Sequence, residues 1–343
     1  MSPRTWRIVA FVAVLVLAVG MSVGYVLSVR NTQQQHESTA PPVASRPDLA
    51  SVEAVPHLVF RNTAVGADYG LVAAVPLSDP SGPRAFTAAT CDRVYATSTT
   101  GLCLAADRGV LTTFSSRLLD SSWNPTHDLP ISGIPSRARL SRDGQLAATT
   151  NFVYGDSYSN PGQFSTRTYI SDATGKTAGE LEDFDLEVDG KQVNASDRNV
   201  WGVTFADDDL FYATAASGGT TWLVRGSLSA RTLTSIRTDV ECPSLSPDKT
   251  RIAFKKHGKL PPGRWRLAIY DLRTGKETLL AETRSVDDQV EWLDNTHVIY
   301  GLPRAASGTA SSDVWVTPSD GTGTPRVLIA DAWSPAVVDP SRS

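Results

Sequence analysis

The sequence lacks an excess of positive charge. Its 343 residues include 32 Lys and Arg against 36 Asp and Glu, which gives a formal net charge of −4. A protein that binds nucleic acid concentrates basic residues on one face. The composition therefore predicts no nucleic-acid partner.

Signatures of catalysis and of metal binding are also missing. The G-x-S-x-G motif carries the nucleophile of many hydrolases, and its one match is GMSVG (20–24) inside the N-terminal hydrophobic run, with none in residues 30–343. The histidines lack the spacing of metal ligands, and we interpret each as a loop or surface residue: His36, His57, His127, His257 and His297. We expect no enzyme and no cofactor.

Charge is absent from one long hydrophobic run near the N-terminus. Residues 8–29 include no charged side chain, and a helix of this length rises about 33 Å, enough to cross a bilayer core of about 30 Å. Arg4 and Arg7 precede the run, whereas Arg30 alone follows closely. By the positive-inside rule, residues 1–7 form a cytoplasmic tail and the rest of the chain lies outside the cytoplasm.

A cleaved signal peptide is the alternative for this run. A signal peptide has a shorter apolar core, of about 7–15 residues, and ends at a small-residue cleavage site. The sequence GYVLSVRN offers no such site, which favours an uncleaved transmembrane anchor. Residues 30–56 are polar and proline-bearing, as is typical of a flexible stalk.

A degenerate repeat follows the predicted stalk. The segments RARLSRDGQLAATT (137–150) and CPSLSPDKTRIAFKK (242–256) both place Ser, a variable residue, Asp and a turn residue before an apolar strand. Weaker copies extend the series, and the serine positions of the repeat are Thr90, Ser141, Ala206, Ser246, Leu293 and Ser334. The intervals of 51, 65, 40, 47 and 41 residues suit propeller blades of about 40–50 residues.

Predicted hairpins lie between these positions. Each consists of two alternating strands around a turn, and they cover residues 69–87, 101–116, 166–183, 220–236, 265–282 and 312–330. The last repeat, WSP at 333–335, has no hairpin after it, so we expect its strand to complete the first blade. The sequence predicts an all-β fold, a six-bladed β-propeller over residues 57–343.

The repeat also carries a family resemblance. SPDKTRIAF (246–254) followed by IYDLRTGKE (269–277) resembles the repeat of TolB-type β-propellers, and the likeness extends over about residues 57–338. It implies a ring that serves as a protein-interaction platform in the bacterial envelope. TolB proteins carry an α/β domain before the propeller, where this chain has the predicted anchor and stalk.

We assign a structural role to the residues of the repeated turns. An Asp in such a turn accepts hydrogen bonds from backbone N–H groups of the same turn. The residues assigned in this way are Ser141, Asp143, Gly144, Ser246, Pro247, Asp248, Trp333, Ser334 and Pro335.

The acidic run EDFDLEVDG (182–190) has two interpretations. From Asp185 it resembles the start of a calcium loop, but Ser196 stands where an EF-hand loop has a bidentate Glu. Apolar residues alternate with the carboxylates, which favours a strand that turns its acidic side chains to water.

The sequence favours one pairing of the three cysteines. An exported domain lies where disulfides form, and Cys91 and Cys103 flank the predicted hairpin DRVYATSTTGL. Their bridge is a hypothesis, since the register of the strands is not known at this point. We expect Cys242 to be a buried free thiol.

The predicted function is that of a non-catalytic, membrane-tethered scaffold that binds unknown envelope proteins. Its long insertions at 154–167 and 184–200 and the proline-rich hairpin at 258–265 are the first candidates for a partner surface. Two alternatives remain: a lactonase-like hydrolase with channel carboxylates and a metal, and the sensor ectodomain of a signalling system.

Overall fold

A computed structural model describes residues 20–22, 24, 46–109, 111–153, 165–304 and 311–342. The chain divides into two compact units, residues 1–44 with 64–69 and residues 45–63 with 70–343. The second unit contains all the strands described below. Most of the predicted transmembrane segment and stalk lies outside the described residues, as does most of the insertion at 154–167. Among the residues that are described, no helix has the length and apolarity to cross a bilayer.

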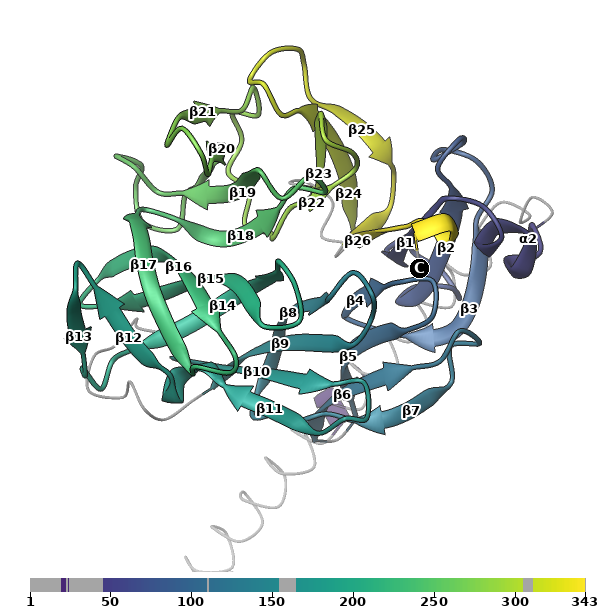
Figure 1. The fold of residues 1–343 in the computed structure, drawn as a ribbon. Coiled ribbons are helices and arrows are strands. Elements are labelled where there is room, and N and C mark those ends of the chain that lie inside the picture. Colours follow the sequence, from purple (N-terminus) through teal and green to yellow (C-terminus); the bar gives the residue numbers. More distant parts are fainter. Residues whose placement is uncertain are drawn as a thin grey trace, which may run out of the picture. The chain divides into compact units, whose positions relative to one another are not determined.

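The second unit is a ring of six sheets, the blades of a β-propeller, in which neighbouring strands are antiparallel except for one pair in blade 4 (Figure 1). From the inner strand outward, blade 1 comprises β26 (Ala332–Val338), β1 (His57–Asn62), β2 (Leu71–Pro76) and β3 (Ala85–Thr90). Blade 2 comprises β4 (Arg93–Ala96), β5 (Gly101–Arg108), β6 (Thr112–Leu119) and β7 (Pro125–Asp128). Blade 3 comprises β8 (Ile134–Leu140), β9 (Leu146–Val153), β10 (Ser165–Asp172) and β11 (Thr177–Glu180).

The other three blades follow the same order. Blade 4 comprises β14 (Asn199–Phe205), β15 (Leu210–Ser217), β16 (Thr220–Ser227) and β17 (Thr232–Thr238), extended by β12 (Asp185–Val188) and β13 (Lys191–Val193). Blade 5 comprises β18 (Glu241–Leu245), β19 (Arg251–Lys256), β20 (Arg266–Asp271) and β21 (Glu277–Leu279). Blade 6 comprises β22 (Glu291–Trp292), β23 (His297–Pro303), β24 (Ser312–Pro318) and β25 (Arg326–Ile329). Short helices occur at α2 (Leu49–Glu53), η1 (Leu181–Asp183) and η2 (Pro340–Arg342).

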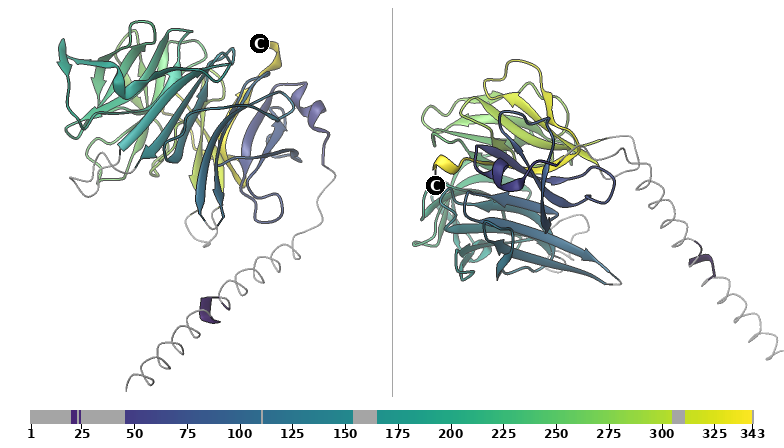
Figure 2. Two further views of the ribbon diagram at one scale, coloured as in Figure 1. Left: turned by 90° about the horizontal axis from the view of Figure 1, so that it is seen from below. Right: turned by 90° about the vertical axis from the view of Figure 1, so that its right-hand side faces the viewer.

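The ring closes through the C-terminal strand. β26 pairs antiparallel with β1, with Leu58 opposite Val337 and Val59 opposite Ala336. Figure 2 shows the yellow C-terminal strand beside the dark blue strands that follow α2. The predicted closure and the six predicted hairpins are confirmed. The hairpins form the third and fourth strands of blades 1, 3, 4, 5 and 6 and the second and third strands of blade 2.

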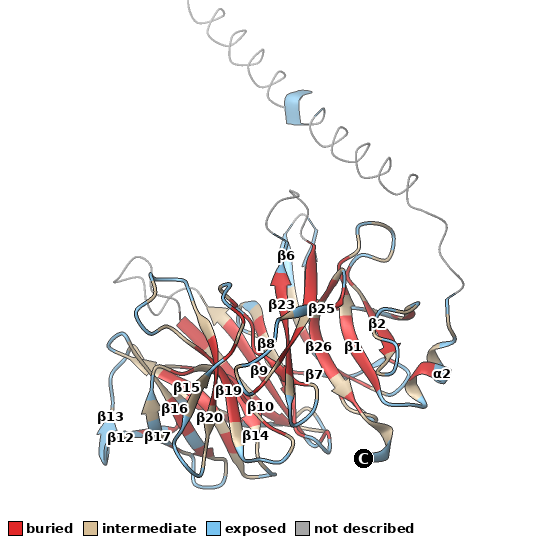
Figure 3. Cartoon of the chain, turned by 90° about the horizontal axis from the view of Figure 1, so that it is seen from above, coloured by how far each residue is buried: buried red, intermediate tan, exposed pale blue. Residues whose placement is uncertain are grey.

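The core is divided among the interfaces between neighbouring blades. Each of six clusters of buried side chains joins two blades that are adjacent in the ring. A blade is therefore apolar on both faces, which explains the continuous apolar run of β2, LVAAVP. Figure 3 shows the buried residues in red along strands such as β1 and β26.

Local turn chemistry explains the outer hairpins of blades 3 and 5. The Oδ1 atoms of Asp172 and Asp271 accept backbone hydrogen bonds from Thr174 and Thr274 at 2.9 and 2.7 Å. The glycine that follows in each turn has a positive φ, 81° at Gly175 and 71° at Gly275. Only glycine adopts this conformation without a steric cost, so the T-G-K sequence specifies both turns.

The acidic run forms the extension of blade 4. Residues 185–188 form β12, which pairs in parallel with β17, and β13 pairs with β12. Leu186 is buried, whereas Asp185 and Glu187 are exposed. The strand interpretation of this run is confirmed.

At two positions of the repeat series the predicted turn is wrong, because the residues lie in strands. Thr90 ends the outer strand β3, and Trp333–Pro335 lie inside the inner strand β26. The corresponding turns begin at Thr97 and Asp339, which follow β4 and β26. Neither turn has the S-x-D pattern, and the Ser334 hydroxyl instead bonds across to β4, donating to Val94 O at 2.9 Å and accepting from Val94 N at 3.1 Å.

Candidate functional site

The inner strands surround the propeller axis and bring charged side chains together there. On one side of this centre, Arg93 contacts Asp288 with an Nη1–Oδ1 distance of 2.6 Å. Asp287 contacts both Lys255 at 2.6 Å and Arg137 at 3.4 Å. Burial raises the pKa of Asp287, but the two cations outweigh burial and hold that pKa below its ordinary value. These ion pairs tie blades 2, 3 and 5 to the segment that leads into β22 of blade 6.

A second level of charge lies nearer the opposite face. Arg139 on β8 forms an ion pair with Glu291 on β22, and Tyr95 Oη donates to Glu291 Oε1 at 3.2 Å. Burial disfavours the charged guanidinium, but the facing carboxylate outweighs burial and raises the pKa of Arg139. Burial and the same carboxylate raise the pKa of Tyr95 to about 12. A cavity of about 20 Å³ lies between the two levels.

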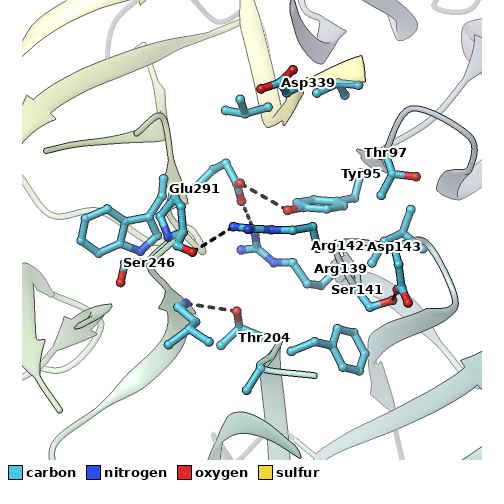
Figure 4. A pocket seen from close by; sticks show the side chains of 18 of the residues that line it. Tyr95, Thr97, Arg139, Ser141, Arg142, Asp143, Thr204, Ser246, Glu291 and Asp339 are labelled. Carbon is cyan, nitrogen blue, oxygen red and sulfur yellow. Dashed lines mark hydrogen bonds and ion pairs between the residues drawn. The ribbon is translucent and has the colours of Figure 1, made fainter. Parts of the chain in front are cut away.

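Above the Arg139–Glu291 pair the centre widens into a cup of about 450 Å³ (Figure 4). All six blades line this cup at the ends of their inner strands, through residues 95–98, 139–143, 204–208, 245–247, 249, 291–293 and 337–339. The rim carries both signs of charge, with Arg142 and Lys249 beside Asp143, Asp207 and Asp208. The cup thus combines charged, polar and apolar side chains, as surfaces that bind partners do.

Side-chain hydrogen bonds fix the turns of this rim. Ser141 Oγ donates to Asp143 Oδ1 at 2.6 Å and accepts from Leu146 N at 2.8 Å. In blade 5, Ser246 Oγ donates to Asp248 Oδ1 at 2.5 Å and accepts from Arg251 N at 3.0 Å. These bonds engage Oδ1 of both Asp side chains within their own turns, as expected of residues with a structural role.

No protein-family model and no curated protein matches the chain. Among solved structures it is similar to TolB from Acinetobacter baumannii, with a TM-score of 0.59 at 15% identity over 82% of this chain and 66% of that chain. This chain has a TolB-like six-bladed β-propeller fold. It spans about two thirds of the length of that TolB protein.

Other solved structures share the propeller. A chain of the nidogen/laminin complex matches with a TM-score of 0.53 at 12% identity, over 82% of this chain and 98% of that chain. A puromycin-hydrolysing peptidase from Mycobacterium tuberculosis matches with a TM-score of 0.46 at 14% identity, over 80% of this chain and 43% of that chain.

The cysteines of the TolB-like propeller lie where two blades meet. Cys91 and Cys103 form a disulfide, with their Cα atoms 5.4 Å apart, in the cluster between blades 1 and 2. Cys242 is buried and free, as expected from the sequence. Its Sγ atom lies 3.4 Å from Nε of Arg137.

One histidine prediction is wrong. His57 lies in β1 and is 3% exposed, rather than in a loop or on the surface. The run HLVFRN is the second strand of blade 1, and both faces of that strand are covered by neighbouring blades. The apolar run that follows His57 in the sequence is the pattern from which its burial in a strand could have been predicted.

The charged centre joins residues that are far apart in the sequence, so no local motif predicts it. Arg93 and Asp288 are 195 positions apart, and Arg139 and Glu291 are 152 positions apart. The one pattern that could have predicted this centre is the charge on the inner strands. Arg137 and Arg139, for example, are two positions apart and therefore lie on one face of β8. Each carboxylate of the centre contacts a cation, an arrangement that suits structural stabilisation.

Proposed function

We propose that this chain is a non-catalytic scaffold of the cell envelope, which is tethered to the membrane by residues 8–29 and binds a protein partner through the cup. The observation that carries the proposal is the cup itself, a recess of about 450 Å³ built by turns from all six blades. Loops held by a rigid framework are a common basis of recognition.

The charged centre supports a binding role over a catalytic one. Asp287, Asp288 and Glu291 contact Lys255, Arg93 and Arg139, respectively. A general base or a metal ligand needs a carboxylate that is open to substrate or metal, whereas these carboxylates are engaged by cations. The TolB-like fold agrees with the envelope role that the sequence resemblance implies.

Membrane attachment rests on the sequence. Residues 8–29 are long and apolar enough for a transmembrane helix, and Arg4 and Arg7 favour a cytoplasmic N-terminus. The propeller then stands outside the cytoplasm on the stalk of residues 30–56. Protease treatment of intact spheroplasts tests this topology, because an external propeller is digested without lysis.

Affinity capture after in-cell crosslinking tests the scaffold. The tagged full chain is compared with residues 1–56 alone and with a rim variant, Asp208→Arg/Lys249→Glu, which reverses two exposed rim charges. We expect the full chain to recover a specific envelope protein that the short chain and the rim variant do not recover. Recovery by the rim variant at the level of the wild type would contradict binding at the cup.

Lys259→Glu provides the matched control. Lys259 is exposed in the turn between β19 and β20, at the ends of these strands that lie opposite the cup. It belongs to the proline-rich hairpin at 258–265 that the sequence predicts as a candidate partner surface. Loss of the partner with Lys259→Glu alone would move the binding site to that opposite face.

A further inference from the structure

A second cavity of about 300 Å³ lies where blade 1 meets blade 2. Its wall is built by α2, β1, the turns after β4 and β6, and the C-terminal residues Val338 and Pro340. The described residues that line it include the acidic Glu53 and Asp120 but no lysine or arginine. Uncompensated carboxylates therefore set the charge of this cavity.

His57 contributes a buried acceptor to the wall. Its Nδ1 lies 2.7 Å from Val55 O, and a carbonyl oxygen only accepts, so Nδ1 carries the proton of this hydrogen bond. Burial lowers the pKa of His57, which keeps the ring neutral at neutral pH. Nε2 is then an unprotonated acceptor, and within the described part of the chain nothing hydrogen-bonds to it. The ring is 3% exposed and lines the cavity.

Each of the two carboxylates is positioned by hydrogen bonds to one of its own two oxygens. Glu53 Oε1 accepts from Trp123 Nε1 at 2.7 Å. Asp120 Oδ1 accepts from the backbone N–H groups of Ser122 and Asn124 at 2.9 and 2.8 Å. The second oxygen of each carboxylate has no hydrogen bond to any described residue, so each side chain is positioned and retains acceptor capacity.

We infer that this cavity binds an organic cation, a primary ammonium or guanidinium group, through Glu53, Asp120 and Nε2 of His57. An ammonium group offers three N–H donors and a guanidinium group offers five, which matches a wall of acceptors. The Trp123 indole adds an aromatic surface, a preferred neighbour of organic cations. The volume is at the lower end for ligand sites and suits a basic side chain or a polyamine.

The inference is independent of the scaffold role, because it requires no protein partner. The Trp123 indole N–H provides the readout, since it donates directly to Glu53. The full-length chain, labelled with ¹⁵N-tryptophan in a nonionic detergent, is titrated at neutral pH with Nα-acetyl-lysine-N-methylamide. We expect the Trp123 indole signal, assigned with Trp123→Phe, to shift and saturate. The uncharged norleucine analogue should leave that signal in place.

A charge-neutral variant tests the assignment to these residues. Glu53→Gln/Asp120→Asn retains the acceptor oxygens for Trp123 and for the Asp120 turn but removes both charges. We expect its affinity for the lysine amide to fall by about tenfold or more. Asp183→Asn/Glu187→Gln removes two exposed charges in and next to the blade 4 extension and should bind as the wild type does.

Three results would overturn the inference: saturation by the norleucine analogue, unchanged affinity in the charge-neutral variant, or binding of calcium chloride in place of the amine. Spermidine and a lysine-containing tripeptide separate the two sources of the cation. Tighter binding of spermidine identifies a free polyamine as the ligand, and tighter binding of the tripeptide identifies a basic side chain.

Discussion

Arg139 and Glu291 form an ion pair across the axis of the propeller. They belong to β8 of blade 3 and β22 of blade 6, which stand opposite each other in the ring of six. Both side chains are largely buried, and Tyr95 from blade 2 donates to the same carboxylate at 3.2 Å. The pair thus links three blades and forms the floor of the cup.

Breaking this pair is expected to destabilise the propeller strongly. Arg139→Ala leaves Glu291 as a buried charge without its cation, which costs about 3–5 kcal/mol in comparable cases. Chemical denaturation of the wild type and the variant measures this loss. The double variant Arg139→Met/Glu291→Leu should recover most of it, because an apolar pair of similar volume removes the unpaired charge. A single variant as stable as the wild type would contradict a structural role for the pair.

Glu182 is expected to make stability depend on pH. Its carboxylate accepts from Thr168 N at 2.9 Å and from Thr166 Oγ1 at 3.1 Å, and burial raises its pKa from 4.5 to about 8. Between these values the unfolded chain releases the proton that the folded chain retains. The free energy of unfolding therefore falls as pH rises from 5 to 8, by about 3–4 kcal/mol.

Denaturant midpoints at a series of pH values check this slope. Glu182→Gln carries no titrating group at this position and should flatten the curve over the same range. Glu187→Gln, an exposed acid on β12, should retain the slope of the wild type. Equal slopes in all three proteins would show that another group titrates.

The disulfide is expected to contribute measurably to stability. Cys91 and Cys103 are 12 positions apart, and closing a loop of this size in the unfolded chain stabilises the fold by about 3 kcal/mol. A reducing agent should lower the melting temperature of the wild type and of Cys242→Ser, which retains the bridge. It should leave Cys91→Ala/Cys103→Ala unchanged. A wild type that is insensitive to reductant would contradict this contribution.

Ring closure by β26 is expected to be essential for folding. Deletion of residues 332–343 removes the inner strand of blade 1 and the Ser334–Val94 hydrogen bonds, and leaves β1 as an exposed edge. The truncated chain should lack a cooperative unfolding transition by circular dichroism and should aggregate in size-exclusion chromatography. Deletion of residues 340–343 spares β26 and should fold normally. A monomeric, cooperative truncated chain would show that the ring does not need this strand.

Much of the fold could be predicted from local patterns. The T-G-K turns at 174–176 and 274–276 and the alternating strands beside them specify hairpins through neighbours only a few positions away. The repeat series failed at Thr90 and Ser334, because the turns at Thr97 and Asp339 lack the S-x-D pattern. The cup could not be predicted, because its wall is drawn from six separate segments.

The sequence by itself determined the strand and turn pattern, the number of blades and the closing strand, because these follow from short-range rules and from the period of the repeat. Only the tertiary structure decided which charges meet at the axis and that His57 is buried beside Glu53 and Asp120. These arrangements join residues far apart in the chain, and their geometry exists only after six blades have closed into a ring. Residues that meet across such a ring have no characteristic spacing in the sequence, so their contacts cannot be predicted from it.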